Sequence, residues 1–119
     1  MSSMTAAQLR LLERYMDLAA QRQALLSSNI ANIDTPGYRT RDIDFHGELM
    51  RAQQDAPNGP TEPLVKEVPG LIARPDGNNV SVDREGLLLS QVQLQFSEVT
   101  QLVKDQFRMI SMAIDKGGS

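Results

Sequence analysis

The residues best suited to metal or acid–base chemistry are three aspartates and the single histidine, close together in the sequence: Asp34, Asp42, Asp44 and His46. A divalent cation needs several carboxylate oxygens or imidazole nitrogens that converge in space. Asp42 and Asp44 alternate with apolar neighbours, which predicts an extended segment with one polar and one apolar face. We favour a solvated strand or loop edge here, and we predict no metal and no cofactor.

Other catalytic arrangements find little support in the sequence. With one histidine and no GxSxG pattern, a serine triad can hardly be assembled. The glycines of the middle region are scattered, so they form no phosphate-binding loop. The chain has no cysteine, which excludes a thiol nucleophile, a disulfide and a cysteine metal site. We therefore predict a protein that is not an enzyme, with no catalytic residues and no small-molecule substrate.

Length and charge narrow the remaining classes. A chain of 119 residues allows one domain at most. Twelve basic and fifteen acidic residues give a net charge of −3, without the basic excess typical of nucleic-acid-binding proteins. No apolar run approaches the ~20 residues of a membrane helix, and the N-terminus lacks the pattern of a secretory signal. Taken alone, these features indicate a soluble cytosolic protein.

The first element that must position any site is a helix predicted over residues 5–33, within an N-terminal unit of residues 1–33. Thr5 and Gln8 have the spacing of a capping box. Apolar residues recur at steps of three, four and seven, which places them on one stripe of a helix. The stripe comprises Leu11, Leu12, Tyr15, Leu18, Ala19, Leu25, Leu26, Ile30 and Ile33.

A second helix is predicted over residues 84–115, within a C-terminal unit of residues 83–119, with Asp83 as its N-cap. Its apolar residues follow a heptad pattern of about four repeats. One row consists of Leu89, Phe96, Val103 and Ile110. The other row consists of Val92, Val99, Gln106 and Ala113.

The middle unit, residues 34–82, holds all six prolines and reads as irregular, with short β segments. We predict a loop over residues 55–63, a short strand over 64–68 that pairs with 70–75, and a turn over 76–79. The fold class is therefore mainly α: two long terminal helices pair as a coiled-coil hairpin around an irregular middle.

The apolar stripes have two possible uses. They can pack on each other within one chain, or they can be assembly surfaces that are poorly ordered alone and buried among copies or partners. We favour assembly, because a hairpin covers each stripe on one side only. The predicted interface consists of Leu11, Tyr15, Leu18, Leu25, Leu89, Val92, Phe96, Val99, Val103 and Ile110.

The most informative segment follows the first helix. Asn29 and Asn32 interrupt the apolar stripe, where an amide can fix helix register or can simply cap the helix end. Pro36 and Gly37 then suit a type II turn, because glycine accepts the positive φ of its third position. Tyr38 follows as an amphipathic anchor.

The run SNIANIDTPGYR resembles the N-terminal signature of bacterial flagellar rod and hook proteins. The matching positions are Ser28, Asn29, Ile30, Ala31, Asn32, Thr35, Pro36, Gly37, Tyr38 and Arg39. The segments RDIDF (41–45) and DGNNVSVDRE (76–85), together with the short length, are similar to the proximal rod branch of that family.

The resemblance implies a structural subunit of the proximal rod, a part of the drive shaft that transmits torque from the membrane ring to the hook. It implies export by the flagellar type III apparatus without a cleaved signal, which replaces the cytosolic inference. Implied partners are other rod proteins, the adaptor FliE, the membrane ring, the export apparatus and further copies of this chain. Two alternatives stay open: a sister proximal rod protein, FlgC, and a small cytosolic coiled-coil adaptor that binds a partner helix.

Overall fold

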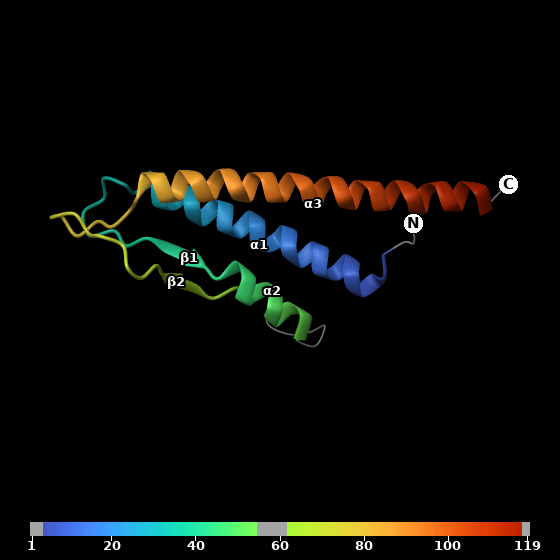
Figure 1. Ribbon diagram of the computed structural model, residues 1–119, viewed down its shortest axis with the longest axis horizontal. Helices are drawn as coiled ribbons and strands as arrows, with labels where there is room; N and C mark the ends of the chain where they lie inside the picture. The colour runs from blue at the N-terminus through green and yellow to red at the C-terminus, as the bar shows by residue number, and fades with distance from the viewer. Residues whose placement is uncertain (1–3, 55–61, 118–119) are drawn as a thin grey trace.

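The computed structural model describes residues 4–54 and 62–117 and has an elongated shape of 70 × 28 × 18 Å. Within these two ranges, five elements follow one another (Figure 1). They are α1 (Ala6–Ala31), β1 (Arg41–Ile43), α2 (Phe45–Gln54), β2 (Val65–Glu67) and α3 (Val82–Gly117). The mainly helical fold with a short β-containing middle is confirmed.

Helix α1 begins at the capping box that the sequence predicts. The Thr5 hydroxyl accepts a hydrogen bond from Gln8 N at 3.1 Å, and Gln8 Oε1 accepts one from Thr5 N at 2.8 Å. These two bonds satisfy donors that a helix start leaves without partners. At its other end the helix stops at Ala31, and Asn32 closes it with a side-chain bond from Nδ2 to Ser28 O.

Helix α3 starts two residues before the position that the sequence indicates. Ser81, not Asp83, is the capping residue, because its hydroxyl accepts from Arg84 N at 3.3 Å and its carbonyl accepts from Glu85 N at 2.9 Å. A serine hydroxyl caps as well as a carboxylate does. Asp83 lies instead in the first turn, where its charge suits the positive end of the helix dipole.

The two long helices pack as an antiparallel hairpin, with both chain ends on the same side of the molecule (Figure 1). The centre of their contact is Ala19, Leu26 and Val92, all fully buried. With 36 residues against 26, α3 is about 54 Å long and α1 about 39 Å at ~1.5 Å per residue. The far end of α3 therefore extends beyond α1.

The two strands form a small antiparallel sheet in which Arg41 pairs with Glu67 and Ile43 pairs with Val65. The predicted strand at 64–68 is thus present, but its predicted partner at 70–75 is wrong. That segment contains Gly70 at φ +82° and enters a turn in which Gly77 N donates to Arg74 O. Because this turn begins within the segment, no run of extended backbone there is long enough to pair with the strand at 64–68.

Helix α2 is an element that the sequence analysis missed. Asp44 caps it, since its carboxylate accepts from Gly47 N at 3.1 Å and its carbonyl accepts from Glu48 N at 2.9 Å. Phe45 then packs edge-on against Tyr15 of α1, with ring centroids 5.0 Å apart. Asp44 followed by apolar residues four apart was a usable signal for a capped helix.

Within residues 4–54 and 62–117, no helix combines the length and the apolar character needed to cross a membrane. Most of the loop predicted over 55–63 falls outside the described residues.

Candidate assembly interface

The turn after α1 has the geometry that its sequence predicts. Tyr38 N donates to Thr35 O at 3.2 Å across Pro36 and Gly37, and Gly37 has φ +74°. A positive φ at this position is the mark of a type II turn. The turn also contacts the second loop, residues 68–81 between β2 and α3, because Gly37 N donates to Asp76 O at 2.9 Å.

Asn29, the first amide of the motif, is fully buried and uses both ends of its side chain. Its Nδ2 donates to Arg41 O at 2.8 Å and to Glu85 Oε2 at 2.9 Å. Its Oδ1 accepts from Tyr38 OH at 2.9 Å and from Arg41 N at 3.3 Å. The amide thus pairs with β1 as a neighbouring strand would and also links α1 to α3.

Beside Asn29, a row of charged side chains also links α1, β1 and α3. Asp42 is 8% exposed and lies between Arg22 Nη2 at 3.0 Å and Arg84 Nη2 at 2.9 Å. Arg84 also pairs with the fully buried Glu85. We call the set of residues that carries this link the joint cluster: Arg22, Asn29, Tyr38, Asp42, Arg84 and Glu85.

The pKa of Asp42 reports the balance of forces in this cluster. Burial of the carboxyl favours its neutral form, but hydrogen bonds and charge from Arg22, with further bonds from Ile43 N and Arg84, outweigh that effect and lower the pKa. Asp42 is therefore held ionised as a structural anion. A carboxylate shared by two guanidiniums is a strong, directional link.

A second set of polar side chains closes the C-terminal end of α1. Asn78 is fully buried, and its Nδ2 donates to Asn32 O at 2.9 Å and to Thr35 O at 2.8 Å. Arg74 Nη2 donates to Ile33 O at 2.6 Å. The carbonyls of the turn directly after α1 thus find their partners in a segment some 40 residues away, a role that the sequence analysis missed.

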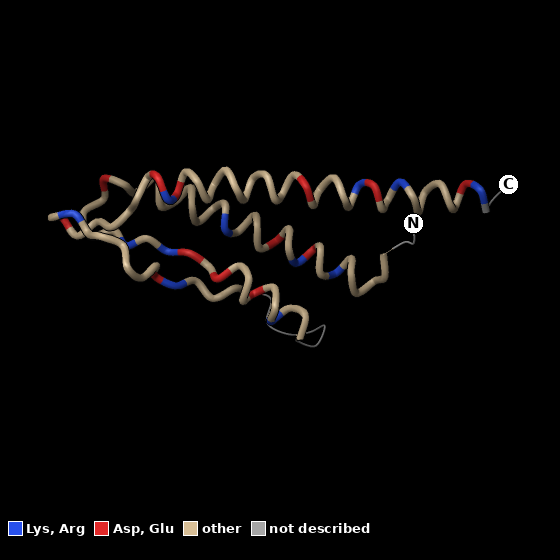
Figure 2. Tube along the Cα trace, viewed as in Figure 1, with Lys and Arg blue, Asp and Glu red and all other residues tan. Residues whose placement is uncertain are grey.

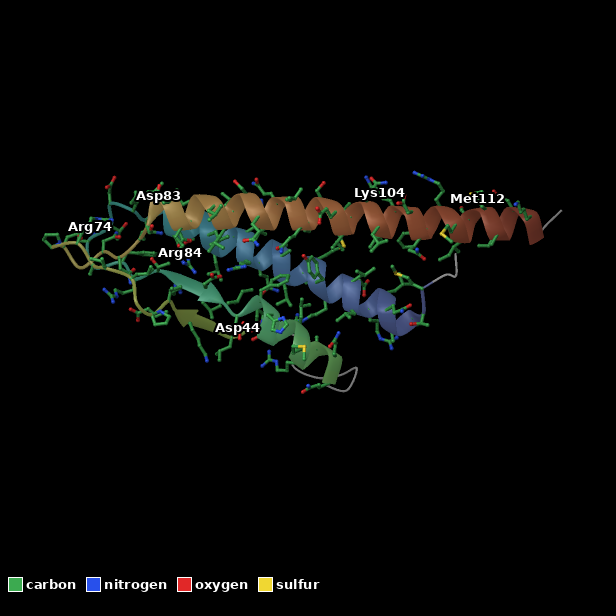
Figure 3. All side chains as sticks on the ribbon, in the orientation of Figure 1. Asp44, Arg74, Asp83, Arg84, Lys104 and Met112 are labelled. Carbon is green, nitrogen blue, oxygen red and sulfur yellow. The ribbon has the colours of Figure 1, made fainter. Side chains whose placement is uncertain are left out.

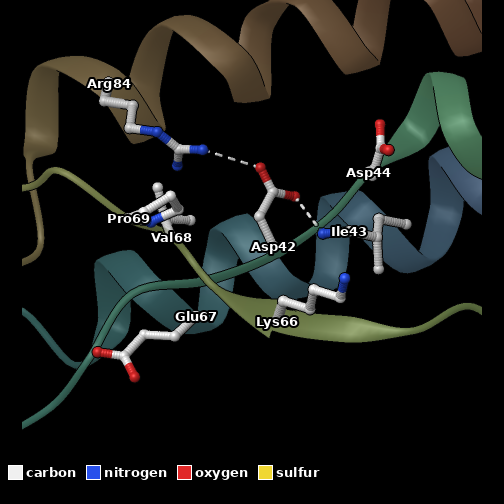
Figure 4. A pocket seen from close by; sticks show the side chains of 8 residues that line it. All are labelled: Asp42, Ile43, Asp44, Lys66, Glu67, Val68, Pro69 and Arg84. Atoms are coloured by element: carbon white, nitrogen blue, oxygen red, sulfur yellow. Dashed lines mark hydrogen bonds and ion pairs between the residues drawn. The ribbon is translucent and has the colours of Figure 1, made fainter.

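The metal candidate is not assembled. Asp34, Asp44 and His46 are exposed, and Asp42 is occupied by two arginines. Among the residues that the structure describes, no three such side chains are placed to hold a metal ion. An open depression of about 260 Å³ lies between the strands and the start of α3, where Arg84 reaches across to Asp42 (Figure 4).

The structure divides the family motif into an inner and an outer part. Asn29 is buried, Asn32 and Tyr38 are half-buried, and all three hold internal hydrogen bonds. Ser28 and Ile30 are half-buried in the last turn of α1. The exposed members are Ala31, Thr35, Pro36, Gly37 and Arg39.

The predicted interface residues line the inner faces of the hairpin. Leu18 and Val92 are fully buried within the chain, so they are already covered. Ile110, by contrast, is 37% exposed. The half-buried members are Leu11, Tyr15, Leu25, Leu89, Phe96, Val99 and Val103.

Two further apolar sets on α3 were not in the predicted interface. Leu87 and Leu94, one heptad apart, are 71% and 62% exposed on the face away from α1. Phe107, Ile110 and Ile114 lie beyond the point where Met4 N donates to Gln106 Oε1. We call this part of α3, residues 107–117, the overhang. It is exposed because α1 is shorter, a length difference that the sequence pattern did not reveal.

The distribution of charge agrees with a second covered face on α3. After Asp83, Arg84 and Glu85 the helix carries no Lys, Arg, Asp or Glu until Glu98, a stretch seen as uninterrupted tan in Figure 2. Asp83 and Arg84 themselves point to different sides of the helix start, Arg84 toward the strands (Figure 3). An uncharged helix with exposed leucines on its outer side is typical of a helix that has neighbours on both sides.

Known proteins match this chain over almost its whole length. A family model described as Flagella basal body rod protein matches residues 16–39, which cover the second half of α1 and the motif turn. The relative from Escherichia coli (strain K12), named flagellar basal body rod protein FlgB, is 32% identical over 132 residues, covering 93% of this chain and 95% of the relative. The FlgB proteins of Salmonella typhimurium (strain LT2) and Borrelia hermsii are also 32% identical, over 95% and 87% of this chain and 96% and 93% of their own lengths.

Proposed function

The chain belongs to the FlgB family of flagellar basal body rod proteins, and we propose on that basis that it is a structural subunit of the proximal rod. The near-complete alignment with FlgB proteins is the single observation that carries this proposal. In this role the protein is part of the drive shaft that transmits torque from the membrane ring to the hook. Its place is the flagellar basal body, and membership of the rod implies contact with other basal body components.

We propose no catalytic role for the chain. The relatives are named for a rod, and a rod subunit works through shape and contacts. The buried charges fit that function, because Asp42 and Glu85 are each satisfied by arginine or amide partners inside the chain. The cytosolic adaptor and the sister protein FlgC are not favoured, since the full-length relatives are FlgB proteins.

We further propose which surfaces contact neighbours in the rod. The large apolar groups that the hairpin leaves exposed include those of the overhang and the outer leucines of α3. Exposed apolar patches of this kind mark interaction sites. Neighbouring copies of this chain, other rod proteins and the adaptor FliE are the partners that we propose for them. Export by the type III apparatus without a cleaved signal belongs to the same proposal.

Localisation tests the function directly. We expect the protein in isolated basal bodies from the parent strain, and we expect a strain without it to lack rods and motility. Rods of normal length in that strain would contradict the proposal.

Two aspartate substitutions test the surfaces. Val99→Asp places a charge between the helices and should abolish assembly and motility while export stays detectable. Leu94→Asp places the same charge on the outer face, where Leu94 is 62% exposed, so the monomer should stay folded while rod assembly fails.

Gln93→Asp, at an exposed polar position next to Leu94, is the matched control and should swim normally. Normal swimming of the Leu94→Asp strain would exclude the outer face from the assembly interface.

A further inference from the structure

The apolar side chains between α1 and α3, which we call the seam, allow more than one axial position of the two helices. Leu89, Phe96, Val103 and Ile110 repeat every seven residues along α3. On α1, Leu11, Leu18 and Leu25 repeat with the same spacing. If α3 slid by seven residues against α1, apolar side chains would again meet apolar side chains. The seam therefore favours pairing of the helices but does not by itself select one axial position.

Two polar residues interrupt the second row of α3. That row runs from Glu85 through Val92 and Val99 to Gln106, at intervals of seven residues. Glu85 is fully buried and Gln106 is 8% exposed, so both have left water on folding. A buried polar group is tolerated only where it finds a hydrogen-bond partner.

Each of the two polar residues finds its partner at a different end of α1. Glu85 Oε2 accepts from Asn29 Nδ2 at 2.9 Å in the last turn of α1. Gln106 Oε1 accepts from Met4 N at 3.2 Å, just before the Thr5 cap. A slide by one heptad would break both contacts together, and the slide that brings Val92 to the place of Glu85 would leave the amide of Asn29 opposite a valine.

We propose that Glu85 and Gln106 set the axial register of α3 against α1 and exclude a hairpin slipped by one heptad. Glu85 contacts the C-terminal end of α1 by accepting a hydrogen bond from Asn29. Gln106 contacts the start of α1 by accepting one from the backbone of Met4. This role concerns the fold of one chain and does not depend on the structure that the chain assembles into. It gives a reason for burying an acid and an amide where leucine would pack better.

The test uses the absence of cysteine from the chain. Gln21→Cys and Gln101→Cys place one spin label on each helix at exposed positions, and pulsed electron paramagnetic resonance measures the distance between them. The otherwise native chain should give one distance. The variant Asn29→Leu with Glu85→Leu and Gln106→Leu should add a second population, since a slide of seven residues moves one helix by about 10 Å along the other.

The control for charge is Glu85→Gln, which keeps an oxygen for Asn29 and should retain a single distance. The control for added apolar surface is Gln93→Leu at an exposed position, which should also give a single distance between the labels. A single, unchanged distance in the triple variant would overturn the proposal.

Circular dichroism completes the experiment. We expect the triple variant to keep its helicity, because leucine adds apolar area to the seam. Loss of helicity would overturn the proposal, since the apolar side chains would then not pair the two helices without the polar residues. A labelled parent without helices in dilute solution would overturn the proposal too, because neighbouring subunits would then set the register.

Discussion

The two ends of the helical hairpin differ in what covers them. At the joint, where α1 turns into β1 and the second loop enters α3, the fully buried side chains include polar ones such as Asn29, Asn78 and Glu85. At the overhang, large apolar side chains such as Phe107 and Ile114 are 63% and 68% exposed. This is the reverse of the usual arrangement, in which apolar groups are inside and polar groups outside.

The difference shows which end is complete in one chain. Polar side chains can be buried at the joint because each meets a partner from a distant segment, such as Asn78 with the carbonyls of Asn32 and Thr35 just after α1. Apolar groups of the overhang have no helix beside them within the described chain. We therefore expect changes at the joint to alter the stability of the monomer, and changes at the overhang to alter assembly.

The largest effect on stability should come from Asn29→Ala. The change removes four hydrogen bonds and leaves the buried Glu85 carboxylate with Arg84 alone. We expect the free energy of unfolding to fall by about 3 kcal/mol, measured by urea denaturation. Ser27→Ala, at an exposed position of the same helix, should change it by less than about 0.5 kcal/mol. Equal effects of the two changes would mean that the buried hydrogen bonds of Asn29 do not stabilise the joint.

Acid should weaken the joint through Asp42. Its folded pKa is lowered, so the carboxylate stabilises the fold above the ordinary value of about 4, and this contribution is lost as the pH falls through the folded pKa. Denaturation at a series of pH values should therefore show parent stability falling below about pH 4. Asp42→Asn should be less stable at neutral pH, and its difference from the parent should shrink in acid. A difference independent of pH would contradict the role of Asp42.

Two glycine substitutions should act in opposite directions. Gly37 has φ +74°, and an alanine there meets no neighbouring atom, so backbone strain alone should lower stability by about 1 kcal/mol. Gly86 lies inside α3 with free space around it, and Gly86→Ala should raise stability by about 0.5–1 kcal/mol. Thermal unfolding of both variants measures these two changes in stability. A stabilised Gly37→Ala protein would exclude the tight turn.

The smallest effect on the monomer should come from Ile114→Ser in the overhang. Its side chain is 68% exposed, so the free energy of unfolding should change by less than about 0.5 kcal/mol. Rod assembly and swimming should nevertheless fail, because the serine removes apolar area from the proposed contact. Lys104→Ser, at another exposed position of α3, is the matched control and should keep both rod assembly and swimming. Motile Ile114→Ser cells would mean that the overhang is not a contact surface.

Periodicity explains why the helices were predictable. The steps of three, four and seven residues, with Thr5 at the start, fixed α1 and α3 to within a few residues. The Pro36–Gly37 turn was equally local, because its geometry follows from two residue types. Helix α2 was missed, although Asp44 and the apolar residues after it carried a local signal.

The joint cluster could not be found in the same way. Asn29 and Glu85 are 56 residues apart, and Arg74 and Asn78 reach the end of α1 only after the second loop has folded back. Nothing in the residues near Glu85 shows that its partner is an amide on another helix. Likewise, the exposure of Phe107 depends on where α1 ends in space, which a single heptad pattern does not contain.

The small sheet has one further consequence. Asn29 occupies the outer edge of β1, so only the edge of β2 can accept another strand. Val68 N donates to Thr40 O, and the alternation of antiparallel bonds then turns the backbone of Val65 and Glu67 outward. If two copies joined there about a two-fold axis, Lys66 would face Lys66. Like charges in that position oppose edge-to-edge pairing of two subunits.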